Sequence, residues 1–203
     1  MNPSDFEKAR TRHLARQIAY KKHGCDPQGE SWFVIEKSLP LEGRILEVGS
    51  GQGYFAMGLA ERGLSIVGVD PCADDIAIAR WNLEQRNLSA LVELQVANGD
   101  SLPFPDRSFE VIFSVKVFHH LASPFKVVDE MIRVLAIEGK IVISDFSEEG
   151  FSLVERIHCE IEGEHHPRLG VALVEVKKHL VDKGLGVQHE RTRFQETLIA
   201  YAA

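Results

Sequence analysis

The stretch 44-RILEVGSGQGYF-55 decides the fold of this 203-residue chain. It begins as a short apolar run that ends in Leu46 and Val48, and it then carries glycines at the alternate positions 49, 51 and 53. Apolar residues resume at helical spacing from Phe55, so the stretch predicts a strand, a tight glycine turn and the start of a helix. Glycines at the carboxyl end of a strand let the backbone turn sharply and let a ligand come close. We therefore expect the ligand site of an open α/β sheet here.

The spacing of the glycines and the acidic residue before them restrict the ligand. A dinucleotide fingerprint, G-x-G-x-x-G, would place its third glycine where this chain has Tyr54. Glu47 stands two residues before Gly49, at the lip where a dinucleotide would lay its pyrophosphate. A carboxylate about 4 Å from a unit charge contributes roughly 4 kcal/mol at an effective dielectric constant near 20, and the sign of that charge decides between attraction and repulsion. The stretch therefore favours a cationic ligand over a phosphate.

Acidic residues also follow the next two apolar runs. Asp70 ends the run 64-LSIVGV-69, and Asp100 stands in 98-NGDS-101, after the run 91–96. A carboxylate at the tip of the second strand can accept hydrogen bonds from two ribose hydroxyls. The alternative for Asp70 is a cap for the helix expected over 73–87, although Asp74 can serve as that cap and leave Asp70 free. The alternative for Asp100 is an ordinary turn aspartate.

Taken in order, 47-EVGSGQG-53, 69-VD-70 and 99-GDS-101 resemble the class I S-adenosylmethionine-dependent methyltransferases. The resemblance covers roughly residues 40 to 147. It implies S-adenosyl-L-methionine as cofactor, a sulfonium with an ammonium group and two ribose hydroxyls, in agreement with the charge argument. It also implies that Asp100 and Ser101 contact the adenine ring. The cofactor-binding residues expected on this basis are Glu47, Gly49, Ser50, Gly51, Gly53, Asp70, Pro71, Asp100, Ser101 and Ser114.

The resemblance implies a Rossmann-like, doubly wound α/β fold with a seven-stranded sheet that is mostly parallel and has its last strand antiparallel. The apolar runs agree with this fold, because a short connection between two strands at the C-terminal end predicts an antiparallel hairpin. The strands expected after the first lie near 64–69, 91–96, 108–115, 139–146, 187–194 and 196–201.

The length of the chain fits one domain, 1–203, with a sizeable core. We expect it to comprise an N-terminal helical cap (1–39), a cofactor-binding core (40–147), a lid-like insertion (148–170), and a closing helix with a β-hairpin (171–203). Within the cap, Ser4 or Asp5 is expected to start one helix and Ser31 a second. The cap either lies over the cofactor, as the resemblance implies, or packs on the sheet edge.

His119 and His120 follow the fourth expected strand. The pair resembles the same edge in small-molecule and quinone-type methyltransferases. The Asp/Asn-Pro-Pro-aromatic loop of enzymes that methylate base amino groups is replaced here by 114-SVKV-117. An imidazole titrates near neutral pH, so one of the two rings could remove the proton that an acceptor loses. The alternative is one packed and one solvated histidine.

A second group of histidines lies in the insertion after the fifth strand. His158 and Glu162 are four residues apart and would share a helix face, and His165 and His166 follow a break at Gly163. These histidines could orient or deprotonate an acceptor from a lid, or form part of an inert solvated helix. A metal site is the weaker interpretation, because no tight ligand spacing repeats, and no metal is expected. The candidate catalytic residues are His119, His120, His158, His165 and His166.

The composition of the chain restricts the classes of partner that we expect it to bind. The formal net charge of −7 and the isoelectric point near 5.7 disfavour a protein that grips a nucleic-acid backbone. Three widely spaced cysteines suggest neither a disulfide framework nor a zinc ribbon. No apolar stretch in the charged N-terminal segment is long enough for a signal peptide or membrane span, so a cytoplasmic location is expected. The expected partner is a small-molecule substrate, without nucleic acid or membrane, for a monomer or homodimer.

The sequence therefore predicts methyl transfer from S-adenosylmethionine to a small-molecule acceptor by in-line displacement. Such a reaction mainly needs the nucleophile to be aligned with the methyl group and water to be excluded. A non-catalytic cofactor-binding protein with a regulatory or assembly role is the alternative. An NAD-dependent reductase is disfavoured by Tyr54 and Glu47.

Overall fold

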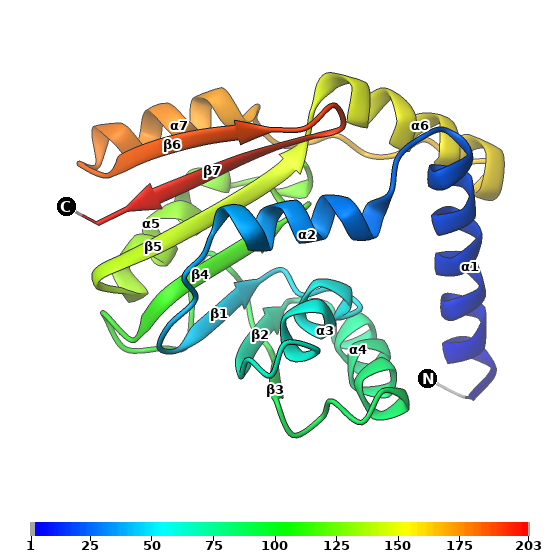
Figure 1. Cartoon of the computed structure of the whole chain (residues 1–203), viewed down its shortest axis with the longest axis horizontal. Coiled ribbons are helices and arrows are strands. Elements are labelled where there is room, and N and C mark those ends of the chain that lie inside the picture. Colours follow the sequence, from blue (N-terminus) through cyan, green and yellow to red (C-terminus); the bar gives the residue numbers. More distant parts are fainter. Residues whose placement is uncertain (1–2, 203) are drawn as a thin grey trace.

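The computed structural model describes residues 3–202, and its centre is one seven-stranded sheet (Figure 1). The strand order is β3-β2-β1-β4-β5-β7-β6, in which β7 is antiparallel to both neighbours and the other pairs are parallel. The predicted Rossmann-like sheet with an antiparallel last strand is confirmed. The strands are β1 (Ile45–Val48), β2 (Ile66–Asp70), β3 (Val92–Val96), β4 (Phe109–Val115), β5 (Leu135–Phe146), β6 (Gly186–Arg191) and β7 (Gln195–Tyr201).

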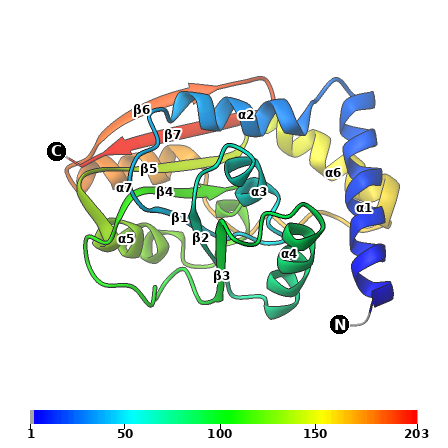
Figure 2. The same cartoon turned by 60° about the horizontal axis from the view of Figure 1, so that its bottom comes forward.

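Helices cover both faces of the sheet (Figure 2). On one face, α5 and α7 pack against β1, β4 and β5 through residues such as Val127, Met131 and Leu180. On the other face, α2, α3 and α4 contribute residues such as Ile35 and Leu59 to a second apolar cluster. The helices are α1 (Pro3–Lys22), α2 (Pro27–Lys37), α3 (Tyr54–Ala60), α4 (Ala73–Gln85), α5 (Pro124–Val134), α6 (Glu148–Glu162) and α7 (Leu173–Asp182).

Two helices, α1 and α6, lie beyond the carboxyl ends of the central strands (Figure 1). An ion pair between Arg16 of α1 and Glu162 of α6 joins them. A small apolar cluster around Ile157 and Phe194 lies beneath α6, with Ala19 and Tyr20 of α1 packed against it. α1 therefore reaches over the edge of the sheet at which the glycine turn is expected. Within residues 3–202, none of the helices combines the length and apolar character required to span a bilayer.

Two elements begin four residues earlier than the sequence predicts. Ser31 does not start the second helix, because α2 begins at Pro27, a residue suited to the first helical position, and the Ser31 hydroxyl donates to the Pro27 carbonyl. β5 begins at Leu135, four residues before the expected start. Phe109 pairs with Leu135 whereas Val111 pairs with Lys140, so the strand enters the sheet through a bulge that a periodicity argument does not detect.

Candidate functional site

The glycine turn after β1 is fixed by hydrogen bonds to β2. The N–H groups of Gly49 and Ser50 both donate to the Val69 carbonyl, at 2.8 and 3.0 Å. Gly49 has a φ of +84°, and a Cβ atom there would lie 2.4 Å from the side chain of Val117. A Cβ atom at Gly51 would have no heavy-atom neighbour within 4 Å, so the space above this residue is open. The turn thus needs glycine for its conformation and leaves room for a ligand.

Asp70 joins the glycine turn to the start of α4. Its Oδ2 accepts from the N–H of Gly51 and its Oδ1 from the N–H of Cys72, both at 2.9 Å. The expectation that Asp74 caps α4 and leaves Asp70 free is wrong. The N-cap of α4 is Cys72, which makes no side-chain capping bond, and Asp70 supplies the acceptor near this helix start. Burial raises the pKa of Asp70, while these two N–H donors oppose that rise.

Glu47 lies buried inside β1, which corrects the expectation that its side chain stands at the lip of the site. The residue is only 2% exposed, and its Oε2 atom is buried without a hydrogen-bond partner among the described residues. Burial raises the pKa of Glu47 to about 8, and nearby Asp70 adds to the rise. The carboxyl group is therefore mostly neutral at pH 7. It becomes a favourable anion only when a cation compensates for its burial.

The remaining predicted cofactor residues lie along the same edge in different environments. Ser50 is buried, and its hydroxyl is 3.4 Å from the Glu47 carbonyl. Ser114 is fully buried, and its hydroxyl donates to the Val48 carbonyl at 2.9 Å, which ties β4 to β1. Pro71 follows β2 and is exposed, and Asp100 and Ser101 are exposed in the segment that follows β3. Asp70 contacts the glycine turn directly, whereas the side chains of Asp100 and Ser101 make no hydrogen bond to any residue in the described part of the chain.

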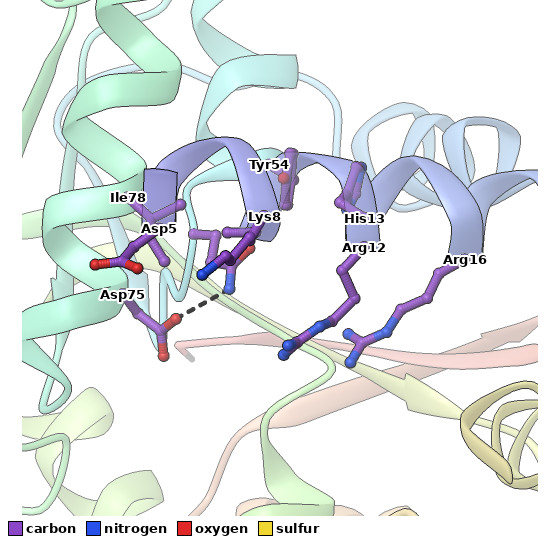
Figure 3. A pocket seen from close by; sticks show the side chains of 10 residues that line it. Asp5, Lys8, Arg12, His13, Arg16, Tyr54, Asp75 and Ile78 are labelled. Atoms are coloured by element: carbon purple, nitrogen blue, oxygen red, sulfur yellow. Dashed lines mark hydrogen bonds between the residues drawn. The ribbon is translucent and has the colours of Figure 1, made fainter. Parts of the chain in front are cut away.

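A cavity of about 500 Å³ separates α1 from the glycine turn and α4 (Figure 3). Lys8, Arg12 and Arg16 line it from α1, one turn apart along the helix. Gln52 of the turn and Asp75 of α4 form the opposite wall, where the Gln52 amide donates to the Asp75 carboxylate at 3.1 Å. The N-terminal cap therefore forms one wall of a cavity at the predicted cofactor edge. Nothing in the spacing of the chain identified this basic wall.

The aromatic pair His13–Tyr54 connects α1 to the glycine turn. The two rings stack with their centroids 3.5 Å apart and their planes at 11°. Burial lowers the pKa of His13 to about 4, and the charges of Arg16 and Lys116 add to this effect. Tyr54, which stands where the dinucleotide pattern requires a glycine, thus packs its ring against His13 of α1.

A second cavity, of about 450 Å³, contains a histidine cluster. His119 is buried in a short 3₁₀ helix, η1 (Phe118–His120), and its Nδ1 lies 2.6 Å from Asp145 Oδ1. The backbone N–H of His119 donates to the other oxygen of the same carboxylate at 2.9 Å. His119 Nε2 faces His166 Nε2 at 3.0 Å. Asp145 was not identified from the sequence, although its place at the carboxyl end of β5 is a position where ligand-binding side chains occur.

The structure brings four of the five candidate histidines together. The His120 and His158 rings pack against His166, with centroid separations of 5.0 and 4.4 Å. His165 is different, since it stands at the rim of the cavity with its side chain 88% exposed and hydrogen-bonded to Glu155 of α6. The predicted helix break at Gly163 is confirmed, and it lets the chain turn back so that His166 reaches η1.

Desolvation keeps most of this cluster uncharged. Burial lowers the pKa of His166 to about 3, and the neighbouring histidines lower it further. Partial burial, together with His119, lowers the pKa of His120 to about 4. The pKa of His158 is lowered for the same main reason, with Arg16 adding to the effect. These three imidazoles are neutral at pH 7 and offer nitrogen lone pairs to the cavity.

The two cavities meet at α1. His13 and Arg16 line both of them, so the histidine cluster and the glycine turn lie behind the same helix. Lys116, at the exit of β4, also lines the histidine cavity, and burial lowers its pKa. The arrangement places a pocket of neutral bases next to the predicted cofactor edge.

Comparison with known proteins supports this assignment. Residues 46–143 match the family model described as a methyltransferase domain. The demethylmenaquinone methyltransferase of Thermus thermophilus is 36% identical over 122 residues, which cover 58% of this chain and 54% of that protein. An uncharacterized methyltransferase of Mycobacterium leprae is 33% identical over 116 residues, which cover 57% of this chain and 42% of that protein. The chain thus spans about half the length of the curated relatives it matches.

Solved structures share the fold. A SAM-dependent methyltransferase from Aquifex aeolicus superposes with a TM-score of 0.69 at 21% identity, with 100% of both chains covered. Phosphoethanolamine N-methyltransferase 2 of Haemonchus contortus, solved with S-adenosyl-L-methionine, gives a TM-score of 0.71 at 15% identity over 93% of this chain and 56% of that chain. Residues 46–143 are thus similar to the methyltransferase domain of S-adenosylmethionine-dependent methyltransferases.

Proposed function

We propose that this protein transfers a methyl group from S-adenosylmethionine to a small-molecule acceptor bound in the histidine cavity. The observation that carries the proposal is that this cavity and the cavity beside the glycine turn share His13 and Arg16. An acceptor among the histidines would therefore lie next to a cofactor on the glycine turn. Methyl transfer requires mainly this proximity, alignment, and the exclusion of water by α1 and the segment that follows β5.

The cofactor would occupy the carboxyl edge of β1, β2 and β3. Asp70, with its oxygens at the turn, would accept from the ribose hydroxyls, and Asp100 with Ser101 would contact the adenine ring. The open space above Gly51 lets the cofactor approach the backbone. The positive charge of the cofactor would draw Glu47 into its ionised form, because attraction to a nearby cation opposes the burial that now keeps it neutral.

The histidine cluster would engage the acceptor. Asp145 accepts a hydrogen bond from His119 Nδ1–H, and this contact directs His119 Nε2 into the cluster. His120, His158 and His166 line the same cavity and would orient the acceptor or receive its proton. His165 has no part in this proposal because its side chain is 88% exposed and contacts Glu155 rather than the other histidines.

The test has two stages. Calorimetric titration with S-adenosylmethionine and, separately, with NAD should show binding of the sulfonium alone. A screen of small thiols, quinols, amines and carboxylates should then show release of S-adenosylhomocysteine with at least one acceptor. His119→Ala should lower turnover and leave cofactor affinity unchanged, with His189→Ala, on β6 away from the cavity, as the matched control. Cofactor binding without turnover for any acceptor class would favour the non-catalytic alternative, and binding of NAD alone would refute the proposal.

A further inference from the structure

The His119, His120 and His166 side chains bring three ring nitrogens together beside the second cavity. A ring nitrogen of each lies within 4.8 Å of a ring nitrogen of the other two. The Nε2 atoms of His119 and His166 are 3.0 Å apart. Two imidazoles bound to one tetrahedral Zn²⁺ at 2.0–2.1 Å have their nitrogens roughly 3.3 Å apart, so only a small opening of this pair would admit an ion.

The hydrogen-bond partners of each ring show which of its nitrogens remains available to bind an ion. His119 directs Nδ1 at Asp145, so Nε2 is the ring nitrogen that faces His166. His166 Nδ1 is buried with no hydrogen-bond partner among residues 3–202, so protein contacts leave this ring incompletely paired. The three ring nitrogens therefore converge on one point, where a single ion could be bound by all of them.

Asp145 is placed as the carboxylate that orients a metal-bound histidine. Ligating histidines in proteins usually donate their other ring N–H to a carboxylate or carbonyl group, which fixes the ring and makes it a better ligand. Asp145 accepts from His119 Nδ1–H and is itself held by the N–H groups of His119 and Phe146, at 2.9 and 2.8 Å. The carboxylate is buried and supplies negative charge directly behind the cluster.

The segment that carries His166 is held firmly against η1. The N–H groups of Leu169 and Gly170 donate to the His119 carbonyl at 2.8 and 3.0 Å. A Cβ atom at Gly170 would lie 1.8 Å from the Phe118 carbonyl oxygen, so this close approach needs glycine. His119 and His166 are thus fixed relative to each other by backbone contacts, which is the preorganisation that a metal site requires.

We propose that His119, His120 and His166 form a binding site for a divalent transition-metal ion such as Zn²⁺, with Asp145 orienting His119. Imidazole ligands suit Zn²⁺, Cu²⁺, Ni²⁺ and Fe²⁺, whereas Mg²⁺ and Ca²⁺ require oxygen ligands. Three protein ligands beside a cavity leave a fourth coordination position open to another molecule. The sequence predicted no metal because the ligands come from two segments that are 46 residues apart.

The open position gives the metal a role in the proposed reaction, and this step alone rests on the proposed function. A bound ion lowers the pKa of a thiol, phenol or hydroxyl that coordinates it, because it stabilises the anion. The three histidines would then act as ligands, and the acceptor would lose its proton to solvent on binding the metal. Arg16 and Lys116 line the same cavity and would favour such an anionic acceptor.

A second group of potential ligands provides the competing explanation for any metal binding. Glu155, Cys159 and His165 also lie within 4.8 Å of one another, on the exposed side of α6. Cys159 and His165 are exposed, and the carboxylate that His165 contacts, on Glu155, is 40% exposed rather than buried. A variant with Cys159→Ser and His165→Ala removes it and leaves the buried histidines intact, so this variant is the matched control.

The experiment is a titration of the metal-free, untagged protein with Co²⁺ and Zn²⁺, followed by calorimetry and by the visible absorption of four-coordinate Co²⁺. We expect one ion per chain, an affinity reduced 10-fold or more in His166→Ala and in His120→Ala, and an affinity reduced about 10–100-fold in Asp145→Asn. The control variant should bind as the parent protein does. Circular dichroism and thermal unfolding of each variant show whether it is folded.

The proposal is overturned by absence of stoichiometric binding at millimolar metal, by unchanged affinity in a folded His166→Ala protein, or by loss of binding in the control variant alone. These outcomes are independent of methyl transfer. Metal binding without any turnover would leave the metal site standing and refute the proposed function. Turnover that a chelator does not affect, in a protein that binds no metal, would support the proposed function and refute the metal site.

Discussion

Replacement of Glu47 by glutamine should stabilise the cofactor-free protein, although Glu47 belongs to the predicted cofactor site. The ordinary pKa of a glutamate is 4.5, and burial raises that of Glu47 to about 8. Between these two pH values the native protein retains a proton that the unfolded chain releases, so this residue lowers stability as the pH rises. At pH 7 the free energy of unfolding is lowered by roughly 3 kcal/mol, because each pH unit above 4.5 contributes about 1.36 kcal/mol and pH 7 lies about 2.5 units above it. Glutamine keeps the shape and is neutral at every pH.

The assay is thermal or urea unfolding of both proteins from pH 4.5 to 8. The difference in unfolding free energy should be near zero at pH 4.5 and should grow to roughly 3 kcal/mol at pH 7, which corresponds to a rise in Tm of about 6–12 °C for a chain of this length. Glu84→Gln, at an exposed position of α4, is the control and should show no such pH dependence. A Glu47→Gln protein that gains no stability between pH 4.5 and 7 would show that the carboxyl group is already paired in the native state.

Three further substitutions test the geometry of the site. Gly49→Ala should destabilise the fold by about 1–3 kcal/mol in urea unfolding and abolish cofactor binding in calorimetry, because its new methyl group would meet Val117 at a φ of +84°. Asp70→Asn should weaken S-adenosylmethionine binding 10-fold or more, because an NH₂ group would replace one of the two carboxylate oxygens that accept from Gly51 in the turn and from Cys72. Equal affinity of the two proteins would contradict this. Gly163→Ala should cost about 1 kcal/mol in thermal unfolding, because this residue ends α6 at a φ of +71° in open space, and a neutral effect would count against the strain argument.

The sheet and the glycine turn were predictable because their signals are local and mutually consistent. A strand, alternate glycines and a resumed helical period are all contained in residues 44–60, and the acidic residue 70 follows the next apolar run. Each of these features depends on near neighbours in the chain, so periodicity and turn chemistry detect them. The order of the strands then follows from the family resemblance that these signals carry.

Local reasoning failed where two signals competed or where burial decided the outcome. Ser31 and Pro27 both favour a helix start, and the structure uses the earlier residue. Glu47 reads as an anion beside a ligand, yet complete burial in β1 changes its charge state, and burial of a single side chain is a tertiary property. The contact of His119 with Asp145 and His166 joins residues 26 and 47 positions apart, which no spacing rule predicts.

One physical cause, desolvation, acts on both halves of the site and shifts the pKa of its buried acid and of its histidines in opposite directions. Desolvation raises the pKa of the Glu47 carboxyl and lowers the pKa of His120 and His166, so the acid is mostly neutral and both bases are neutral at pH 7. A cationic cofactor entering between them would meet no repulsion from imidazolium groups. Its charge would favour ionisation of Glu47, whose new anion then attracts it, and the same cation would hold the histidines in their neutral form. The lone pairs needed at the acceptor would thus be preserved by the cofactor itself.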